Sequence, residues 1–467
     1  MPWLLPLLGI ALFSFLAVIC AAAVHGVIWQ GKMPWSELPP PDANLILAET
    51  LAVLSLILVA GIGMSPGFLN LSSVNAFYAG RLIRAYLGAS NPVRLKASRI
   101  SGISKAKHKH TGGEKNKSHS VQQNHPADNI APHIYHDGQI LAPVHLINIT
   151  MNQTVSPNSQ LVQQDRKGRN FVVGPDGVHV DDHQLSANKP DGEPKKESAA
   201  EKFERDLQIG QWAAISGAAA STGMGQGTSL GTALLFAFAN IRLGYWWPAP
   251  DMPDNKNSSG NTDKKKTNFF RRLFETHCYL LAEMTARYDP VKQRRLYLSD
   301  GGHFENTAAY ELIRRQVPLI LLSDAGCDPN YMFDDLANLI RKARIDFGTE
   351  MTVLDDKEIQ KIFPNSHQWI SQPDNFDDKE MAKADACAVA FRLGYQGGKT
   401  GYLLSLKPRL TSFASLDVHN YAANNPAFPQ EPTADQFFDE AQWESYRKLG
   451  YDIATTLFAQ PSASGLW

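Results

Sequence analysis

The sequence has few cysteines. Four occur among 467 residues, and no two have the C-x-x-C spacing of zinc sites and redox motifs. Their wide separation also argues against a disulfide framework, so we expect a reducing compartment and neither a metal nor an organic cofactor. The four are Cys20, Cys278, Cys327 and Cys387.

The sequence also lacks an excess of charge of either sign. Lysine and arginine number 45 and aspartate and glutamate 46, which gives a net charge of −1. Such a chain has no overall positive field to attract nucleic acid, so nucleic-acid binding is not expected. Hydrophobic residues make up 43%, enough for packed cores, and the length suits two or three domains.

Charged residues are almost absent from two N-terminal segments. Residues 3–29 contain no Asp, Glu, Lys or Arg, and residues 44–69 contain only Glu49. Each segment exceeds the roughly 20 apolar residues that cross a bilayer as a helix. Together they predict a two-helix transmembrane hairpin over residues 1–69. A cleaved signal peptide is the alternative for the first segment, but the basic start of a signal peptide is missing.

A basic segment follows the second hydrophobic run. By the positive-inside rule, it places the large C-terminal portion in the cytoplasm. Within residues 70–96, positions 75–89 combine apolar and basic side chains at helical spacing. This pattern predicts a basic juxtamembrane helix that lies on the membrane surface or, alternatively, packs on its own domain. The basic residues are Arg81, Arg84, Arg94, Lys96 and Arg99.

Large apolar residues are rare in residues 97–129, which predicts a flexible linker. The linker histidines have no fixed geometry for a metal, and we expect a solvated basic segment. Two polar insertions, residues 176–204 and 251–266, predict surface loops within an α/β domain over residues 130–460. The linker histidines are His108, His110, His119 and His125.

The apolar blocks of that domain predict a parallel sheet. Residues 145–151 predict a strand, and residues 211–243 predict a buried helix after a glycine-rich loop. Residues 296–326 predict a βαβ unit, in which two apolar strands and a helix belong to a parallel sheet covered on both faces. Residues 334–345 predict an amphipathic helix whose acidic first turn either favours the helix dipole or, alternatively, binds calcium.

The end of the first strand of this βαβ unit is the leading candidate site. Asp300, Gly301 and Gly302 follow that strand, and ligands of open α/β sheets bind beyond the carboxyl ends of strands. The glycines let the backbone approach a substrate, and the carboxylate can act as a base. A simple turn is the alternative. Residues 323–326 end the next strand and are expected to line the same crevice.

A serine nucleophile is harder to find in the sequence. Residues 227–231 form a G-x-S-x-G pattern around Ser229. This pattern is typical of the nucleophile elbow, in which a serine occupies a sharp strand-to-helix turn. Residues 216–226 before it are rich in alanine and glycine and do not read as a strand. Ser229 is therefore a weak candidate nucleophile, with turn formation as the alternative.

Several separated blocks carry a family resemblance. They are NAFYAGRLIRAYLGA, HLINITMN, AISGAAAS, NIRLGYWW, SDGGHFENTAAYELIRR, LILLSDAG and PTADQFFDEAQWESYRKLGY. Together they resemble the bacterial membrane-associated patatin-like phospholipases, over most of residues 69–458 outside the polar insertions. The resemblance implies a lipid acyl hydrolase of the bacterial inner membrane that acts on membrane lipid. It also implies an incomplete patatin-like parallel sheet with flanking helices.

The resemblance further implies a Ser–Asp dyad. In the family, the aspartate of a D-G-G or D-G-A motif takes the proton of a serine, and a glycine-rich loop stabilises the oxyanion. Asp300 matches this aspartate, and Gly301 and Gly302 match its glycines. The family's glycine-rich loop and serine elbow precede the membrane spans, so a partner chain is expected to carry that N-terminal half. Ser229 lies in a block that does not match the elbow.

Three functions follow from these observations. In the first, the chain is the C-terminal part of a hydrolase, supplies Asp300, and is inactive without a partner that bears the nucleophile. In the second, it is a non-catalytic membrane-anchored scaffold or interaction protein. In the third, Ser229 and Asp300 form a rearranged dyad on a smaller sheet.

Overall fold

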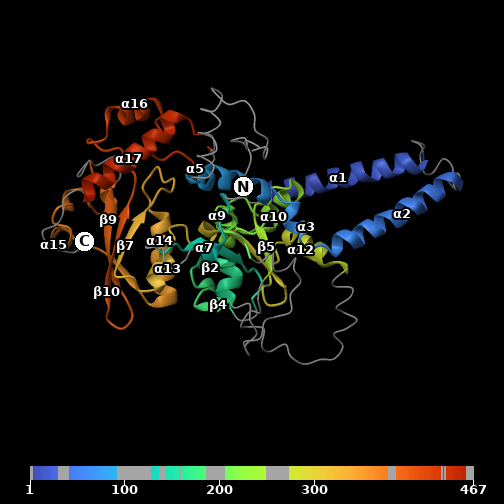
Figure 1. The fold of residues 1–467 in the computed structure, drawn as a ribbon, viewed down its shortest axis with the longest axis horizontal. Coiled ribbons are helices and arrows are strands. Elements are labelled where there is room, and N and C mark those ends of the chain that lie inside the picture. Colours follow the sequence, from blue (N-terminus) through green and yellow to red (C-terminus); the bar gives the residue numbers. More distant parts are fainter. Residues whose placement is uncertain are drawn as a thin grey trace, which may run out of the picture. The chain divides into compact units, whose positions relative to one another are not determined.

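The computed structural model divides the chain into two compact units, Met1–Phe304 and Glu305–Trp467 (Figure 1). The boundary falls inside the residues predicted as one βαβ unit. The structure describes residues 4–29, 42–91, 128–135, 144–156, 159–185, 206–248, 273–376, 385–432, 435 and 438–458.

Two long apolar helices open the first unit. Helix α1 spans Leu4–Trp29 and contacts α2, which spans Asp42–Gly63. Within the described residues, one helix, Leu45–Gly63, is long and apolar enough to cross a membrane, and the apolar stretch Ser14–Ile28 of α1 is shorter than a span. The structure therefore supports one candidate span, and the two-span hairpin stays a prediction.

The helix predicted after the second hydrophobic run is confirmed. Short helix α3 (Phe68–Leu71) is followed by α4 (Asn75–Leu82), which continues through the π-helix η1 (Ile83–Leu87) into α5 (Gly88–Ser90). Contact between this helix and the membrane surface stays a prediction. The predicted linker lies outside the described residues up to position 127.

One face of α4 packs on its own unit. The Asn75 amide donates to the Leu243 carbonyl at 2.5 Å and accepts from Gln211 at 2.6 Å. The opposite side leaves Phe77 exposed, with the Arg81 guanidinium over its ring at 5.2 Å. The alternative that this helix packs on its own domain thus holds for one of its faces.

A six-stranded sheet forms the centre of the first unit, and every neighbouring pair in it is antiparallel. The strand order is β4-β3-β2-β1-β6-β5. The strand predicted at 145–151 is confirmed as β1. The strands are β1 (Ile147–Asn152), β2 (Gly168–Gly174), β3 (Gly177–Val180), β4 (His183–Leu185), β5 (Tyr245–Pro248) and β6 (Arg295–Asp300).

The prediction of a surface loop over 176–204 is wrong at its start. Strands β3 and β4 occupy residues 177–185, where alternate side chains such as Val178, Val180 and Leu185 pack on the core. The remainder up to residue 205, and the insertion predicted at 251–266, lie outside the described residues.

Helices cover both faces of this sheet. Alternate side chains of a strand point to opposite faces, so Leu296 and Leu298 of β6 join one core cluster and Tyr297 another. Helix α9 (Ile209–Ser216) buries Trp212 in the first cluster. Helix α12 (Glu275–Met284) buries Tyr279 in the second. The other short elements are α7 (Pro132–Tyr135), the π-helix η4 (Leu161–Arg166) and α10 (Leu230–Phe238), which packs on α1.

The second unit is built on a four-stranded sheet with the order β7-β10-β9-β8. Strands β7 and β10 are parallel, and the other two pairs are antiparallel. Its strands are β7 (Leu319–Ser323), β8 (Glu350–Val353), β9 (Ala388–Gly394) and β10 (Thr400–Leu406). Its helices are α13 (Ala309–Arg314), α14 (Asp334–Phe347), α15 (Asp356–Ile362), α16 (Leu416–Asn424) and α17 (Glu440–Phe458), with 3₁₀ turns η8 (His367–Trp369) and η9 (Pro373–Phe376).

The predicted mixed α/β class is confirmed, but the predicted parallel sheet is wrong. Strands β6 and β7, expected to be parallel neighbours, belong to different sheets. The apolar run of β6 reflects burial on both faces, which the helices of the first unit supply to an antiparallel sheet as well. The helix predicted at 334–345 is confirmed as α14, and the predicted helix within 211–243 as α10.

Candidate functional site

Asp300 is the last residue of β6, at the start of the 3₁₀ turn η7 (Gly301–His303). Its Oδ1 atom accepts a hydrogen bond from the Gly302 N–H at 2.7 Å. The turn lies directly on β1, because the Gly301 carbonyl accepts from the Thr150 hydroxyl at 3.2 Å. A Cβ atom at position 301 would lie 2.7 Å from the Asn148 carbonyl oxygen, so this close approach requires glycine.

Burial changes the acidity of the groups around Asp300. It raises the pKa of the Asp300 carboxyl, and the Gly302 N–H offsets this in part. Tyr78 of α4 donates its hydroxyl to the Gly217 carbonyl at 3.1 Å. Burial, and after it the negative charge of Asp300, raise the pKa of Tyr78. The site thus pairs a carboxylate of increased basicity with a phenol that stays protonated.

Ser299 and His303 form a hydrogen-bonded chain with Asn152 beside this turn. The His303 Nε2 atom lies 3.1 Å from the Ala219 carbonyl oxygen, which can only accept, so Nε2 carries the proton. Nδ1 is then an acceptor for the Ser299 hydroxyl at 2.8 Å. Ser299 in turn accepts from the Asn152 amide at 2.8 Å. Because Ser299 is fully buried, this chain positions the turn and does not offer a nucleophile to a substrate.

The protonation of His303 provides a first test of this arrangement. Burial lowers the pKa of His303 from 6.5 to about 4, so the folded state holds the neutral ring. The neutral His303 ring makes its full contribution to the free energy of unfolding above the pKa of histidine in the unfolded chain, about 6.5. This contribution is lost as the pH falls from about 6.5 towards about 4, by up to about 3 kcal/mol. In urea titrations of the full chain, His303→Gln should lose less stability than the native chain over this range. Equal losses would contradict the buried neutral ring.

A glycine-rich loop packs against the turn formed by Gly301–His303. Residues 217–229 contain the 3₁₀ turn η5 (Gly225–Gly227), and the Gly225 N–H donates to Asn152 Oδ1 at 2.9 Å. Gly225 has φ of 50°, and a Cβ atom there would overlap the His303 carbonyl oxygen. The loop and the D-G-G turn are therefore packed backbone to backbone.

Ser229 follows this loop and caps helix α10. Its exposed hydroxyl accepts from the Thr232 N–H at 3.2 Å and lies 2.9 Å from the Thr232 hydroxyl. Its backbone is extended, with φ −136° and ψ 152°, and is not the strained turn of a nucleophile elbow. The geometry at Ser229 is that of an ordinary N-cap.

Asp300 and the Gly225 turn of the loop that leads to Ser229 lie on opposite faces of the six-stranded sheet. Asp300 shares the face of Leu298, which packs with α9, because side chains alternate along β6. Ser299 points to the other face, where Asn152 links it to the loop. The structure therefore does not bring the two predicted dyad residues together on one face.

The predicted second wall of the crevice, residues 323–326, belongs to the other sheet. Asp324 follows β7 and forms a buried ion pair with Lys407 at 3.2 Å. Lys407 also donates to the Gly326 carbonyl at 2.9 Å, and the Gly326 N–H donates to Asp324. These residues hold the end of β7 to the end of β10 within the second unit.

The acidic first turn of α14 is used for local contacts. Asp335 accepts from the Asn306 amide at 2.8 Å. Within the described residues, no group of histidine, cysteine, aspartate or glutamate side chains is arranged to hold a metal ion. The alternative of a calcium site at this turn thus has no support in the described part of the chain.

Three residues of the site were not singled out from the sequence: Tyr78, Asn152 and His303. All lie in the sequence blocks on which the predicted family resemblance rests. Comparisons of the chain with protein-family models, with curated proteins and with solved structures found no match.

Proposed function

We propose that this chain is part of a membrane-bound, patatin-like lipid acyl hydrolase, to which it contributes Asp300 as the base. The observation that carries the proposal is the Asp300 carboxyl, which is held at a strand end by the Gly302 N–H and has a pKa raised by burial. The sequence resemblance of the surrounding D-G-G block supports the same role. The basic residues 70–96 favour a cytoplasmic site next to the inner leaflet.

The nucleophile in this proposal is a serine on a partner chain. Ser229 uses its hydroxyl as a helix cap and follows a loop on the other face of the sheet. With a serine brought to Asp300, the carboxylate takes the hydroxyl proton while the serine oxygen attacks the acyl carbonyl carbon of a lipid. The proton then passes to the departing alcohol as the ester bond breaks, and water releases the acyl group in a second step.

A non-catalytic, membrane-anchored scaffold is the second candidate. The bond between Asp300 and the Gly302 N–H is also what an aspartate makes when it only caps a turn. This alternative predicts that the full chain purified from its own membranes hydrolyses no lipid, and that replacing Asp300 has no functional effect.

The deciding experiment uses the full chain isolated from its native membranes in a mild nonionic detergent, with the Asp300→Asn variant and an Asp176→Asn surface control beside it. Asparagine at position 300 keeps the oxygen that accepts from Gly302, so the turn is retained. We expect phospholipid hydrolysis, and a fluorophosphonate label on a serine of a co-purifying polypeptide. Asp300→Asn should lower hydrolysis by about 10²- to 10⁴-fold, the usual contribution of a general base.

Other outcomes of this experiment would reject the proposal. A label on Ser229 that is lost in Asp300→Asn would establish a self-sufficient hydrolase. Hydrolysis that is equal in the native chain and in Asp300→Asn would remove Asp300 from the chemistry. An absence of both label and hydrolysis would favour the scaffold. The Ser229→Ala variant should retain activity and lose only about 1 kcal/mol of stability as a missing helix cap.

A further inference from the structure

The end of the candidate span α2 is attached to the rest of the first unit by direct contacts. The Thr276 hydroxyl of α12 donates to the carbonyl of Gly63, the last residue of α2, at 3.1 Å. A Cβ atom at position 63 would overlap the Leu273 carbonyl oxygen, so this close approach requires glycine. Figure 1 shows α3 and α12 at this end of α2. Both helices therefore lie close to the level at which α2 would leave a bilayer.

Helix α3 is held at the same place by the edge of the six-stranded sheet. The Asn70 side-chain amide donates to the Trp246 carbonyl at 3.0 Å, and its oxygen accepts from the Trp246 N–H at 2.9 Å. These two bonds cover part of the outer edge of β5, which is the last strand of the sheet. Asn70 is buried by this contact, whereas Leu71 beside it is 78% exposed.

Exposed apolar side chains continue from the end of α2 over α3 and α4. They recur every three or four residues, as on one face of a helix, while Leu69 and Asn75 between them are buried. The Arg81 guanidinium lies over the ring of the last of them at 5.2 Å. Residues 50–113 contain no Asp or Glu, so this line carries no negative charge. The line consists of Met64, Phe68, Leu71, Val74 and Phe77.

Helix α12 adds a second line of exposed uncharged side chains. Phe274, Cys278 and Leu281 are four and three residues apart, which places them on one side of the helix. The other side of α12 buries Tyr279 and Ala282 in the core. Because α12 contacts both α2 and α3, the two lines border the same end of the candidate span.

We propose that these two lines rest in the boundary between the headgroups and the acyl chains of the bilayer that α2 crosses. Lipid is the occupant that fits, because the surface is continuous with α2, whose apolar side chains are themselves exposed. An apolar helix face bordered by arginine enters this boundary by about 5–10 Å. The first unit is then held against the membrane by segments far apart in the sequence. The proposal rests on α2 as a span and does not require lipid hydrolysis.

The test is fluorescence quenching in nanodiscs of phosphatidylcholine and phosphatidylglycerol that hold the full chain. One thiol is labelled with the fluorophore NBD at a time, either the native Cys278 or Leu71→Cys, and the other exposed cysteines are replaced by alanine. Lipid with a doxyl quencher near the top of its acyl chain should quench both labels about twofold or more, because a label at this depth lies within about 10 Å of the quencher. Nanodiscs without quencher give the reference intensity.

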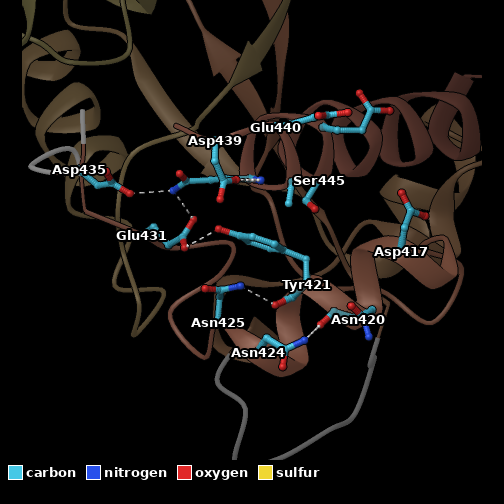
Figure 2. Close-up of a pocket in the computed structure, with 13 residues that line it drawn as sticks. Asp417, Asn420, Tyr421, Asn424, Asn425, Glu431, Asp435, Asp439, Glu440 and Ser445 are labelled. Atoms are coloured by element: carbon cyan, nitrogen blue, oxygen red, sulfur yellow. Dashed lines mark hydrogen bonds between the residues drawn. The ribbon is translucent and has the colours of Figure 1, made fainter. Parts of the chain in front are cut away.

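A control label is placed in the second unit, in the acidic hollow between α16 and α17 (Figure 2). Asn420 is exposed there, and six carboxylates line the same hollow, among them Asp417 and Asp439. An anionic headgroup surface repels carboxylates, and lipid cannot solvate them. A label on Asn420→Cys should therefore keep its full intensity in the presence of the doxyl lipid.

A second pair of variants tests whether the two lines dock together. Leu71→Asp places a carboxylate in the boundary and should lower the quenching of the label on Cys278 about twofold, because burying a charge in lipid costs free energy. Leu416→Asp is the matched control, since Leu416 of α16 is 86% exposed, and it should leave this quenching unchanged.

Three outcomes would overturn the proposal. Labels on Cys278 and Leu71→Cys that are not quenched would show that lipid does not reach the two lines. Blue-shifted emission without quenching would mean that protein covers them instead. Equal quenching of these labels and of the label on Asn420→Cys would mean that the fluorophore itself enters the lipid. None of these measurements depends on hydrolase activity.

Discussion

Arg242→Met is expected to lower the free energy of unfolding by about 3–5 kcal/mol, because it leaves the Glu283 carboxylate buried without its cation. Arg242 and Glu283 are 5% and 2% exposed, and the guanidinium reaches both carboxylate oxygens at 3.1 and 3.2 Å. The Trp246 indole N–H also donates to Glu283, at 2.7 Å. Urea unfolding of the full chain in detergent, followed by tryptophan fluorescence, measures the loss.

The pH dependence of this loss separates an unpaired charge from lost packing. Burial already raises the pKa of Glu283 against the opposing effect of Arg242, so removing Arg242 raises it further. A carboxyl with a raised folded pKa stabilises the fold at low pH and loses this contribution as the pH rises. The deficit of Arg242→Met should therefore shrink on acidification. A deficit independent of pH would mean that the carboxylate is not the cause.

The matched control for this prediction is Arg344→Met in the second unit. Arg344 and Glu350 also form an ion pair, at 3.0 Å, but their side chains are 53% and 61% exposed. Exposed pairs are worth about 0–1 kcal/mol, so this variant should be nearly neutral. The double variant Arg242→Met with Glu283→Met should recover part of the loss, because no buried charge remains. A double variant less stable than Arg242→Met would contradict this account.

Local patterns predicted the elements of the fold better than their pairing. The apolar stripe and charged ends of residues 334–345 were sufficient to predict α14, since both are properties of a single helix. The orientation of β6 was not predictable in the same way. Its neighbours β1 and β5 come from distant parts of the chain, and the apolar sequence 295–298 suits a covered strand in either kind of sheet.

The candidate site shows the same division between local and distant information. Asp300 could be found from the sequence, because a strand followed by D-G-G is a local pattern. The roles of Asn152 and His303 could not, because they depend on contacts such as the one between Asn152 and Ser299, which are 147 residues apart. The opposite faces of Asp300 and the Ser229 loop likewise depend on which helix covers which side of the sheet.

Gly225→Ala is expected to destabilise the first unit by about 2–5 kcal/mol. The residue has φ of 50°, which costs an L-residue about 1–2 kcal/mol, and the new Cβ atom would overlap the backbone carbonyl of His303. Relief of such an overlap requires a backbone shift, which typically costs about 1–3 kcal/mol more. The midpoint of urea unfolding measures the change.

Gly227→Ala is the matched control, because position 227 lies in the same loop but has room for a Cβ atom. The nearest atom would be the Cβ of Met224 at 3.8 Å, an ordinary contact. This variant should be nearly neutral. Because the Gly225 loop packs on the turn that holds His303, Gly225→Ala should also expose the imidazole and raise its pKa from about 4 towards 6.5 in an NMR titration. Equal stability of the two alanine variants, or an unchanged His303 pKa in Gly225→Ala, would show that the loop does not hold the D-G-G turn in place.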